Sequence, residues 1–133
     1  MGLTKRIIPC IDVDLDENGE AAVYTGVNFE NLEHTGDPVE IARQYNAAGT
    51  DEFVCLAIPA SAAGRESMLA TVSRVAEPML IPLPVGGGIR RAAVVRWTLR
   101  TGADKVTINT VARVAPVGVH EAGASSGSRV VVS

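Results

Sequence analysis

The most constraining feature of this 133-residue sequence is a repeated alternation of short apolar runs with segments of helical period. The apolar runs are of strand length and lie at 5–13, 52–58, 79–85, 104–109 and 129–132. Helical patterns separate them: one between the N-cap Asp37 and Gly49, then 65–77, 91–100 and a weaker one within 111–124 that Pro116 and Gly118 interrupt. This alternation is typical of a parallel sheet covered by helices. We therefore expect one α/β domain over residues 1–133, with about four βα units and the start of a fifth strand, half of a (β/α)₈ barrel.

The composition excludes several classes of protein. Hydrophobic residues make up 47% of the chain but aromatic residues only 4%, so the core must consist of Val, Ile, Leu and Ala. The net charge is −3 and no Lys/Arg run occurs, which argues against nucleic-acid binding. No apolar run is long enough to span a membrane and no signal peptide is recognisable, so we expect a cytoplasmic protein. Cys10 and Cys55 lie in expected strands without metal-ligand spacing, so we expect buried, reduced thiols, no metal and no cofactor.

Three local features carry separate expectations. Residues 14–36 read as a long polar loop with a turn at 17–19, and loops of this length are often functional. Pro82 and Pro84 remove two N–H donors that would point to the same neighbouring strand, so this strand should be weak or displaced toward an edge. Trp97 is expected to pack in the core, and His34 and His120 to be solvated.

An internal echo supports the repeated units. Residues 48–54 resemble residues 101–107, and the tripeptide Ile7-Ile8-Pro9 resembles Leu80-Ile81-Pro82. The two offsets differ by about the extra length of the segment 14–36. Duplication of a two-strand unit would give half a barrel.

Asp12 is the first candidate for chemistry, because ligands meet the C-terminal ends of parallel strands and Asp12 ends an apolar run. A partly desolvated carboxylate there can act as a general acid or base. A loop-capping role is the alternative. Asp14 and Asp16 have the spacing of a calcium loop, but the later ligand positions do not match.

The segment Gly86-Gly87-Gly88 is the second candidate, since it lies directly between a strand and a helix. Glycines let the backbone approach an anion, and the following helix N-terminus offers free N–H groups. Asn109 and Thr110, which end the next strand, could add donors to the same anion. The alternatives are a phosphate site and a tight structural turn.

A charged set lies at the opposite end of the strands. Arg6, Glu52 and Lys105 each stand near the start of a strand, so adjacent strands should bring them together. Either they form an ion cluster that closes the core, or they gate a central channel.

Five segments, taken in order, resemble one family. They are 5–13 (KRIIPCIDV), 26–32 (GVNFENL), 36–38 (GDP), 85–90 (VGGGIR) and 102–110 (GADKVTINT). The family is the cyclase subunit of imidazole glycerol phosphate synthase (HisF), a phosphate-binding (β/α)₈ barrel. The resemblance covers nearly the whole chain but only about half of the family's barrel.

The resemblance implies a cyclase that closes an imidazole ring with ammonia from a glutaminase partner, on a substrate with a phosphate at each half of the barrel. It implies that Asp12 is the first catalytic carboxylate. It also implies that Gly88, Asn109 and Thr110 belong to one phosphate site. The charged set matches three members of the family's gate at the ammonia entrance.

The sequence also departs from the family pattern. The second catalytic Asp of the family lies beyond the fifth strand, past Ser133, and Ala57, Pro59 and Thr25 replace an Asp, a Thr and a Lys. We therefore expect a half-barrel that binds phosphorylated sugar-type ligands and is not catalytic alone. Cyclase (lyase) activity in histidine biosynthesis, in an assembled barrel, is the alternative.

An open half-barrel would also leave the strands at 5–13 and 129–132 as unpaired edges and expose apolar side chains. We therefore expect a homodimer or higher assembly through these edges. Binding of a glutaminase subunit through the barrel bottom is a further possibility, although half an interface should bind weakly.

Overall fold

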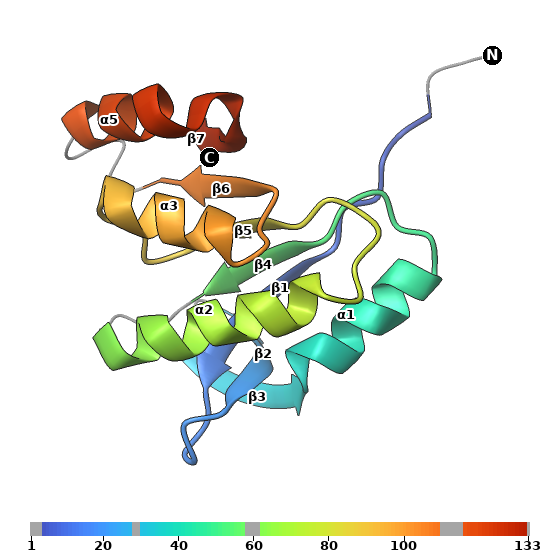
Figure 1. The fold of residues 1–133 in the computed structure, drawn as a ribbon. Coiled ribbons are helices and arrows are strands. Elements are labelled where there is room, and N and C mark those ends of the chain that lie inside the picture. Colours follow the sequence, from blue (N-terminus) through green and yellow to red (C-terminus); the bar gives the residue numbers. More distant parts are fainter. Residues whose placement is uncertain (1–3, 28–29, 58–61, 110–115, 133) are drawn as a thin grey trace.

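The computed structural model describes residues 4–27, 30–57, 62–109 and 116–132 (Figure 1). The strands are β1 (Cys10–Leu15), β2 (Ala21–Val27), β3 (Glu30–Gly36), β4 (Val54–Ala57), β5 (Pro84–Gly86), β6 (Lys105–Ile108) and β7 (Val130–Val132). The helices are α1 (Pro38–Ala47), α2 (Ala62–Ala76), α3 (Ala92–Arg100) and α5 (Pro116–Ser126), and a 3₁₀ turn η1 (Gly127–Arg129) follows α5.

The described strands form one sheet in the order β3-β2-β1-β4-β5-β6-β7. The pairs from β1–β4 to β6–β7 are parallel, whereas β1–β2 and β2–β3 are antiparallel. The helices pack on one face of the sheet, and no described helix covers the other, which we call the uncovered face (Figure 1). The α/β fold is therefore confirmed, as a partial barrel consistent with half of a (β/α)₈ barrel.

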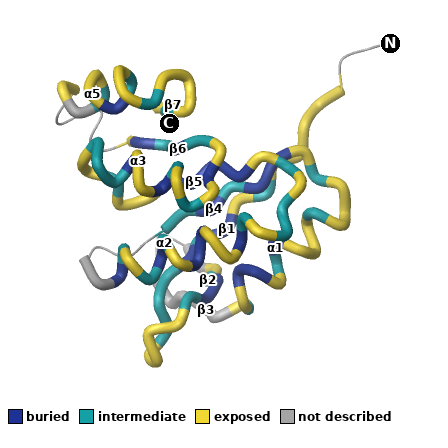
Figure 2. Tube along the Cα trace, viewed as in Figure 1, coloured by how far each residue is buried: buried dark blue, intermediate teal, exposed yellow. Residues whose placement is uncertain are grey.

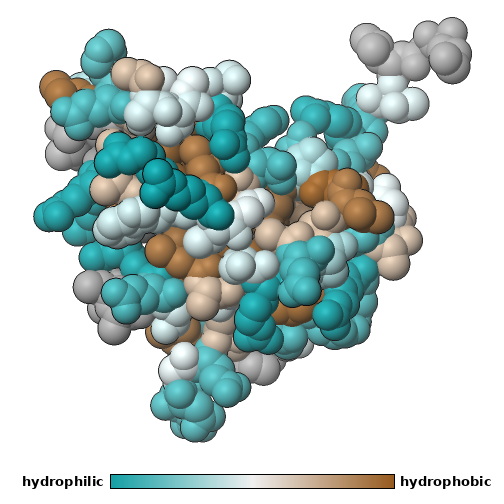
Figure 3. All heavy atoms as spheres, in the orientation of Figure 1, coloured by the Kyte–Doolittle hydropathy of each residue, from teal (hydrophilic) through white to brown (hydrophobic). Residues whose placement is uncertain are grey.

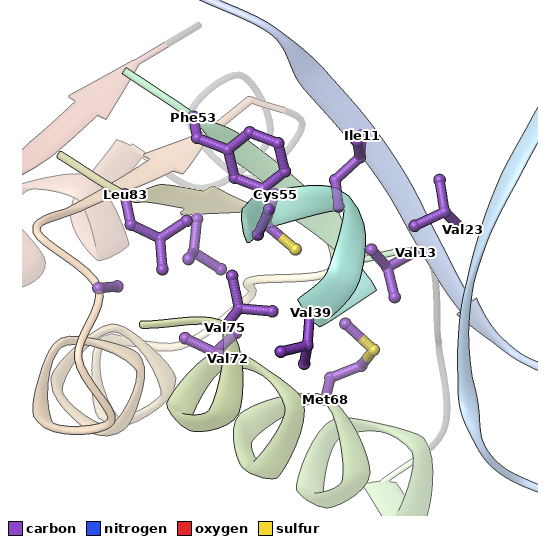
Figure 4. Close-up of a cluster of buried hydrophobic side chains, with 13 residues drawn as sticks. Ile11, Val13, Val23, Val39, Phe53, Cys55, Met68, Val72, Val75 and Leu83 are labelled. Atoms are coloured by element: carbon purple, nitrogen blue, oxygen red, sulfur yellow. The ribbon is translucent and has the colours of Figure 1, made fainter. Parts of the chain in front are cut away.

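The core lies between the sheet and the helices. Its largest cluster combines Phe53 and Cys55 of the β4 region with Val13 of β1 and with Val72 and Val75 of α2, all at 2% exposure or less (Figure 4). A second cluster joins α3 and α5 to β6 through four buried side chains, Val95, Val106, Ile108 and Ala122. As the composition predicted, aliphatic residues build nearly all of it.

Helix α1 begins and ends where the sequence predicts. The Asp37 side chain accepts a hydrogen bond from the N–H of Val39 at 3.4 Å, and Pro38 opens the helix. These are the residues that satisfy and tolerate the free N–H positions of a first turn. After Ala48, Gly49 adopts a φ of 78°, a conformation that favours glycine.

The prediction of a loop over 14–36 is wrong, because this segment forms the antiparallel hairpin of β2 and β3. Asp16 starts the turn into β2: its Oδ1 accepts the N–H groups of Asn18 and Glu20 at 2.8 and 2.9 Å. Gly19 completes the turn with a φ of 77°. The hairpin then pairs with β1, as Val23 faces Val13 in register and is buried. The polar residues around the turn made the segment look like a loop, although Ala22 and Val23 of β2 are both buried.

The strand at 5–13 is consequently not an edge strand, because β2 pairs with β1. The ladder begins at Cys10, although the carbonyls of Ile7 and Pro9 already accept N–H groups from Asp51 and Val54. Among the described strands the edges are β3 and β7, and β7 exposes Val131 and Val132 (Figure 2).

The strand expected over 79–85 shortens to β5, as the two prolines suggested, but it is central rather than displaced to an edge. Phe53 donates its N–H to the carbonyl of Pro82, so Pro82 faces β4. By the two-residue period of a strand, Pro84 faces β4 as well. β6 supplies the pairing on the other side of β5 and keeps it inside the sheet.

Three further expectations need correction. Trp97 is 53% exposed on the outer side of α3 instead of lying in the core. Cys10 is exposed on the uncovered face, whereas Cys55 is buried as predicted. Pro116 begins α5 rather than interrupting it, since proline is tolerated at the first helical position. His120 is exposed, as predicted, and residues 111–115 lie outside the described part.

Only the first internal echo has a structural counterpart. Asp51 donates its N–H to the carbonyl of Ile7, and Asp104 donates its N–H to the carbonyl of Leu83. The structural equivalent of Ile7 is thus Leu83 and not Leu80, so the tripeptide echo does not mark equivalent positions.

Candidate functional site

The uncovered face carries a row of side chains that runs across four strands. Asp12 is in register with Leu56, Leu56 with Gly86, and Gly86 with Thr107. Partners in register project to the same side of a sheet. Since neighbouring strands lie about 4.8 Å apart, the two ends of this row are on the order of 14 Å apart. The row, which we call the uncovered row, lies near the C-terminal ends of the parallel strands.

Asp12 stands at one end of the row and is partly exposed. It also lines a groove of about 820 Å³ between the hairpin and α1, together with Tyr24, Thr25, Glu40 and Gln44. Two tyrosines, two threonines, one glutamine and three carboxylates contribute polar groups to the wall of this groove. Asp12 is therefore accessible to a ligand, as a proton-transferring carboxylate must be.

The charge of Asp12 contributes to the pKa values of the two cysteine thiols. Although Cys10 is exposed as a residue, partial desolvation of its thiol, and then the charge of Asp12, raise the pKa of Cys10 above its usual value. Burial is also the main cause that raises the pKa of Cys55 to about 12, with smaller contributions from Cys10 and Asp12. Both thiols are therefore protonated at neutral pH, which disfavours nucleophilic or metal-binding roles.

Both close packing and backbone conformation require glycine in the loop 86–88. A Cβ at Gly86 would overlap Thr107 Oγ1, and a Cβ at Gly87 would overlap the carbonyl of Ala57. These two glycines are thus required by packing whatever the loop binds. Gly87 and Gly88 have φ values of 88° and 62°, which turn the chain out of β5 toward α3.

The N-terminus of α3 lies directly beyond this loop. Its N-cap is Arg91, which makes no side-chain cap, and the first turn holds no acidic residue. The loop, the helix N-terminus and the exposed Arg90 and Arg91 therefore form an electropositive corner. The cavity behind the loop, about 30 Å³, has space for little more than one water, so an anion would have to approach from the open side.

Asn109 directly follows β6 and is exposed, one strand away from the loop. Thr110, the expected second donor, lies outside the described residues, as do Pro59 and residues 58–61 generally. Thr107, whose hydroxyl occupies the space above Gly86, is a site residue that was not predicted from the sequence. The signal was available, because Thr107 lies two residues before Asn109 in the strand expected over 104–109, and residues two apart in a strand share a face.

The charged set at the other end of the strands comes together as expected. Arg6 Nη1 lies 2.7 Å from Glu52 Oε1, and Lys105 Nζ lies 4.0 Å from the same oxygen. The Glu52 side chain is 10% exposed, whereas Arg6 and Lys105 are 62% and 43% exposed. We call these three residues the charged cluster. Its carboxylate is shielded by two cations, which reduces the cost of burying it.

Among the described residues, no group of His, Cys, Asp and Glu side chains could hold a metal ion. No helix in the described ranges is long and apolar enough to cross a membrane.

Comparison with known proteins gives consistent matches. Residues 6–133 match the family model "Histidine biosynthesis protein". The chain is 64% identical over 132 residues to imidazole glycerol phosphate synthase subunit HisF of Haloarcula marismortui, which covers 99% of the chain and 49% of that relative. It is 64% identical to the Haloquadratum walsbyi subunit over 130 residues and 49% identical to the Methanosarcina mazei subunit over 131 residues. The chain spans about half the length of the curated relatives it matches.

Proposed function

Because the chain belongs to the histidine biosynthesis protein family, we propose that it forms the Asp12-bearing half of an imidazole glycerol phosphate synthase cyclase barrel and binds a phosphorylated ligand there. The observation that carries the proposal is the uncovered row. It has a carboxylate at Asp12 and, on the order of 14 Å away, the polar end formed by Thr107 with the glycine loop beside it. This spacing suits an extended ligand that is phosphorylated at one end and reacts at the other.

The phosphate would bind at the electropositive corner. Backbone N–H groups of the glycine loop and of the first turn of α3 would donate to it, with the Asn109 side chain on the adjacent strand. The helix dipole and the nearby arginines favour a dianion over a neutral group. Thr110 belongs to the same site in the family pattern.

We do not expect the 133 residues alone to turn over the substrate. Asp12 is the single carboxylate in the uncovered row, and the family mechanism uses two. Ala57 stands where the family has an Asp, and its backbone lies directly beneath Gly87. Loss of one group of an acid–base pair commonly costs about 10²- to 10⁴-fold in rate.

Calorimetric titration in phosphate-free buffer tests the site. The wild-type chain would be titrated with inorganic phosphate and with the family's bisphosphorylated substrate, beside Asn109→Ala and the control Asn18→Ala. We expect tighter binding of the substrate, weakened several-fold by Asn109→Ala and unchanged by Asn18→Ala, which alters the hairpin turn only. Absence of heat with both ligands would refute phosphate binding.

Cyclase activity in an assembled barrel is the second candidate, favoured by the position of Asp12 on the uncovered face, in register with Leu56 near the C-terminal end of β4. A turnover assay with ammonia and the same substrate separates the two. We expect no product from the chain alone. Product formation that Asp12→Asn abolishes would establish the cyclase instead.

Self-association is proposed through the open edge of β7. Within the described residues β7 has one neighbour, and its exposed Val131 lies on the uncovered face, in register with Thr107. Sedimentation should show a dimer or larger species, which Val131→Lys reduces because charged residues block edge pairing. Val117→Lys, on the exposed surface of α5, is the matched control. A monomer at micromolar concentration would refute this proposal.

A glutaminase subunit is the proposed partner at the opposite end of the strands. There the charged cluster adjoins Ile7, which is 69% exposed, and Leu80 is 92% exposed before β5. We expect weak binding of a glutaminase subunit by calorimetry, reduced by Leu80→Asp. Equal affinity for the Leu80→Asp variant and the wild-type chain would exclude this surface.

A further inference from the structure

Two aspartates make the same unusual pair of bonds at the N-terminal ends of the strands. Asp51 Oδ2 accepts the N–H of Ile7 at 2.7 Å, and the N–H of Asp51 donates to the carbonyl of Ile7 at 3.1 Å. Both backbone groups of one residue are thus held by one aspartate. We call this arrangement a carboxylate clasp.

Asp104 forms the second clasp. Its Oδ2 accepts the N–H of Leu83 at 2.7 Å, and its N–H donates to the carbonyl of Leu83 at 3.0 Å. The carbonyls of Ala103 and Asp104 are in turn bound by the guanidinium of Arg129, at 3.0 and 3.1 Å. The strand start at β6 is therefore fixed from both sides.

Each clasp directly precedes a member of the charged cluster. Asp51 is followed by Glu52, and the residue that it holds, Ile7, is preceded by Arg6. Asp104 is followed by Lys105. The clasp at Asp51 thus fixes the backbones on both sides of the Arg6–Glu52 pair, whereas the clasp at Asp104 fixes only the lysine of the Lys105–Glu52 pair.

We infer that Asp51 and Asp104 are positioning residues, each of which sets one ion pair of the charged cluster. The geometry of the two pairs agrees with this division. The pair whose two backbones share a clasp is short, at 2.7 Å, and the pair that reaches across the clasp-free β4–β5 boundary is long, at 4.0 Å. The inference concerns the charged end alone and does not depend on phosphate binding or on turnover.

Double-mutant cycles test it in the full 133-residue chain. The coupling between Arg6→Met and Glu52→Gln would be measured by urea unfolding in the wild-type, Asp51→Ala and Asp51→Asn backgrounds. We expect the coupling to be lost with Asp51→Ala and largely restored by Asp51→Asn, which keeps an acceptor oxygen. The coupling between Lys105→Met and Glu52→Gln should respond in the same way to Asp104 and not to Asp51.

A spectroscopic readout separates positioning from a general loss of stability. Nuclear magnetic resonance of the Arg6 guanidinium N–H groups reports how long they stay bound. Their exchange should become several-fold faster in Asp51→Ala and remain unchanged in Asp104→Ala. Asp51→Glu, which keeps the charge but shifts the carboxylate, serves the same purpose if the alanine variant does not fold.

Asp16→Ala is the matched control, because it also removes a side chain that accepts backbone N–H groups, but in the hairpin turn. It should lower stability without changing either coupling. If both couplings persist in the alanine backgrounds, or if Asp16→Ala abolishes them equally, the aspartates do not position the cluster.

Discussion

Gly86→Ala is the sharpest test of how the uncovered row is packed. The new Cβ would fall well inside 3.0 Å of Thr107 Oγ1 and would lie 3.0 Å from Leu56 Cδ2 and 3.4 Å from Thr107 Cβ. Gly86 is not among the residues with positive φ, so an alanine there suffers no backbone strain. The cost is therefore steric, and one hydroxyl causes most of it.

The magnitude follows from this contact list. Overpacking a tight site costs about 1–3 kcal/mol, so we expect Gly86→Ala to lower the free energy of unfolding by about 2 kcal/mol. With Thr107→Ala the overlapping atom is gone, and Leu56 Cδ2 can move because it ends a flexible side chain. In that background Gly86→Ala should cost about 0.5 kcal/mol or less, which leaves a coupling of about 1.5 kcal/mol between the two positions.

Urea unfolding followed by circular dichroism measures this coupling. For a slope of about 2 kcal/mol/M, Gly86→Ala shifts the midpoint by about 1 M, and the shift should nearly vanish in the Thr107→Ala background. Thr107→Val is the control, because a methyl group replaces the hydroxyl and the overlap remains. An equal cost of Gly86→Ala in the Thr107 and Thr107→Ala backgrounds would refute the packing argument.

Three other predictions concern the glycines and the thiols. Gly87→Ala should lower the free energy of unfolding, measured in urea, by more than about 3 kcal/mol, because the new Cβ would overlap the backbone of Ala57 and the residue has a φ of 88°. Gly49→Ala has open space around the new Cβ and a φ of 78°, so it should cost only about 1 kcal/mol. Cys10 should react with a disulfide reagent at pH 8 more slowly than a free thiol, and Asp12→Asn should accelerate it by removing a charge that raises the pKa of Cys10. Burial raises the pKa of Cys55 from 9.0 to about 12, so as the pH rises the thiol deprotonates in the unfolded chain before it does so in the folded chain. The free energy of unfolding, measured in urea, should therefore fall between pH 9 and 12 by up to about 1.4 kcal/mol per pH unit.

Each of these has its own control. Gly19→Ala, which also has open space and a φ of 77°, should behave like Gly49→Ala, and a cost as high as that of Gly87→Ala would contradict the steric argument. An unchanged rate for Cys10 in Asp12→Asn would separate the thiol from that carboxylate. The Cys55→Ala variant should lose the thiol's share of the alkaline slope, and an unaltered slope would assign it to other groups.

The sequence predicted the features that depend on chain direction and on local capping. Parallel strands start at one end and finish at the other, so residues at strand starts had to gather whatever the register. This is why Arg6, Glu52 and Lys105 could be grouped correctly before their distances were known. The start of α1 could likewise be predicted, because Asp37 caps and Pro38 opens the first turn of the helix without any contact from distant residues.

The features that depend on how distant segments pair with each other could not be predicted from the sequence. The strands of the hairpin over 14–36 are held by pairing with β1 and with each other, whereas the acidic residues around the turn dominated the local composition. The tripeptide echo pointed to Leu80, whereas the clasp holds Leu83, because β5 starts later than its apolar run suggested. Trp97 looked like a core residue from its size alone, but Val95 and Thr98 occupy the buried side of α3.

At the candidate site the sequence identified positions but not their causes. Glycines at 86 and 87 were assigned to anion binding, and the structure adds that Thr107 and Ala57 leave no space for a side chain there. This steric reason becomes visible only from the strand register, which brings residues distant in sequence into contact. Asp12 lies inside β1 (Cys10–Leu15) and not at its end as expected, because pairing with the unpredicted hairpin extends the strand to Leu15, and the same hairpin forms the groove beside Asp12.

Pro82, just before β5, and Pro84, its first residue, affect how the molecule opens. Pro82 faces β4, as Pro84 does by the strand period, and neither has an amide hydrogen, so few backbone bonds cross the β4–β5 boundary. Both clasps lie away from this boundary, one at Ile7 and the other at Leu83. The chain should therefore open along this line before either side melts, and native-state hydrogen exchange should divide its amides into two cooperative units.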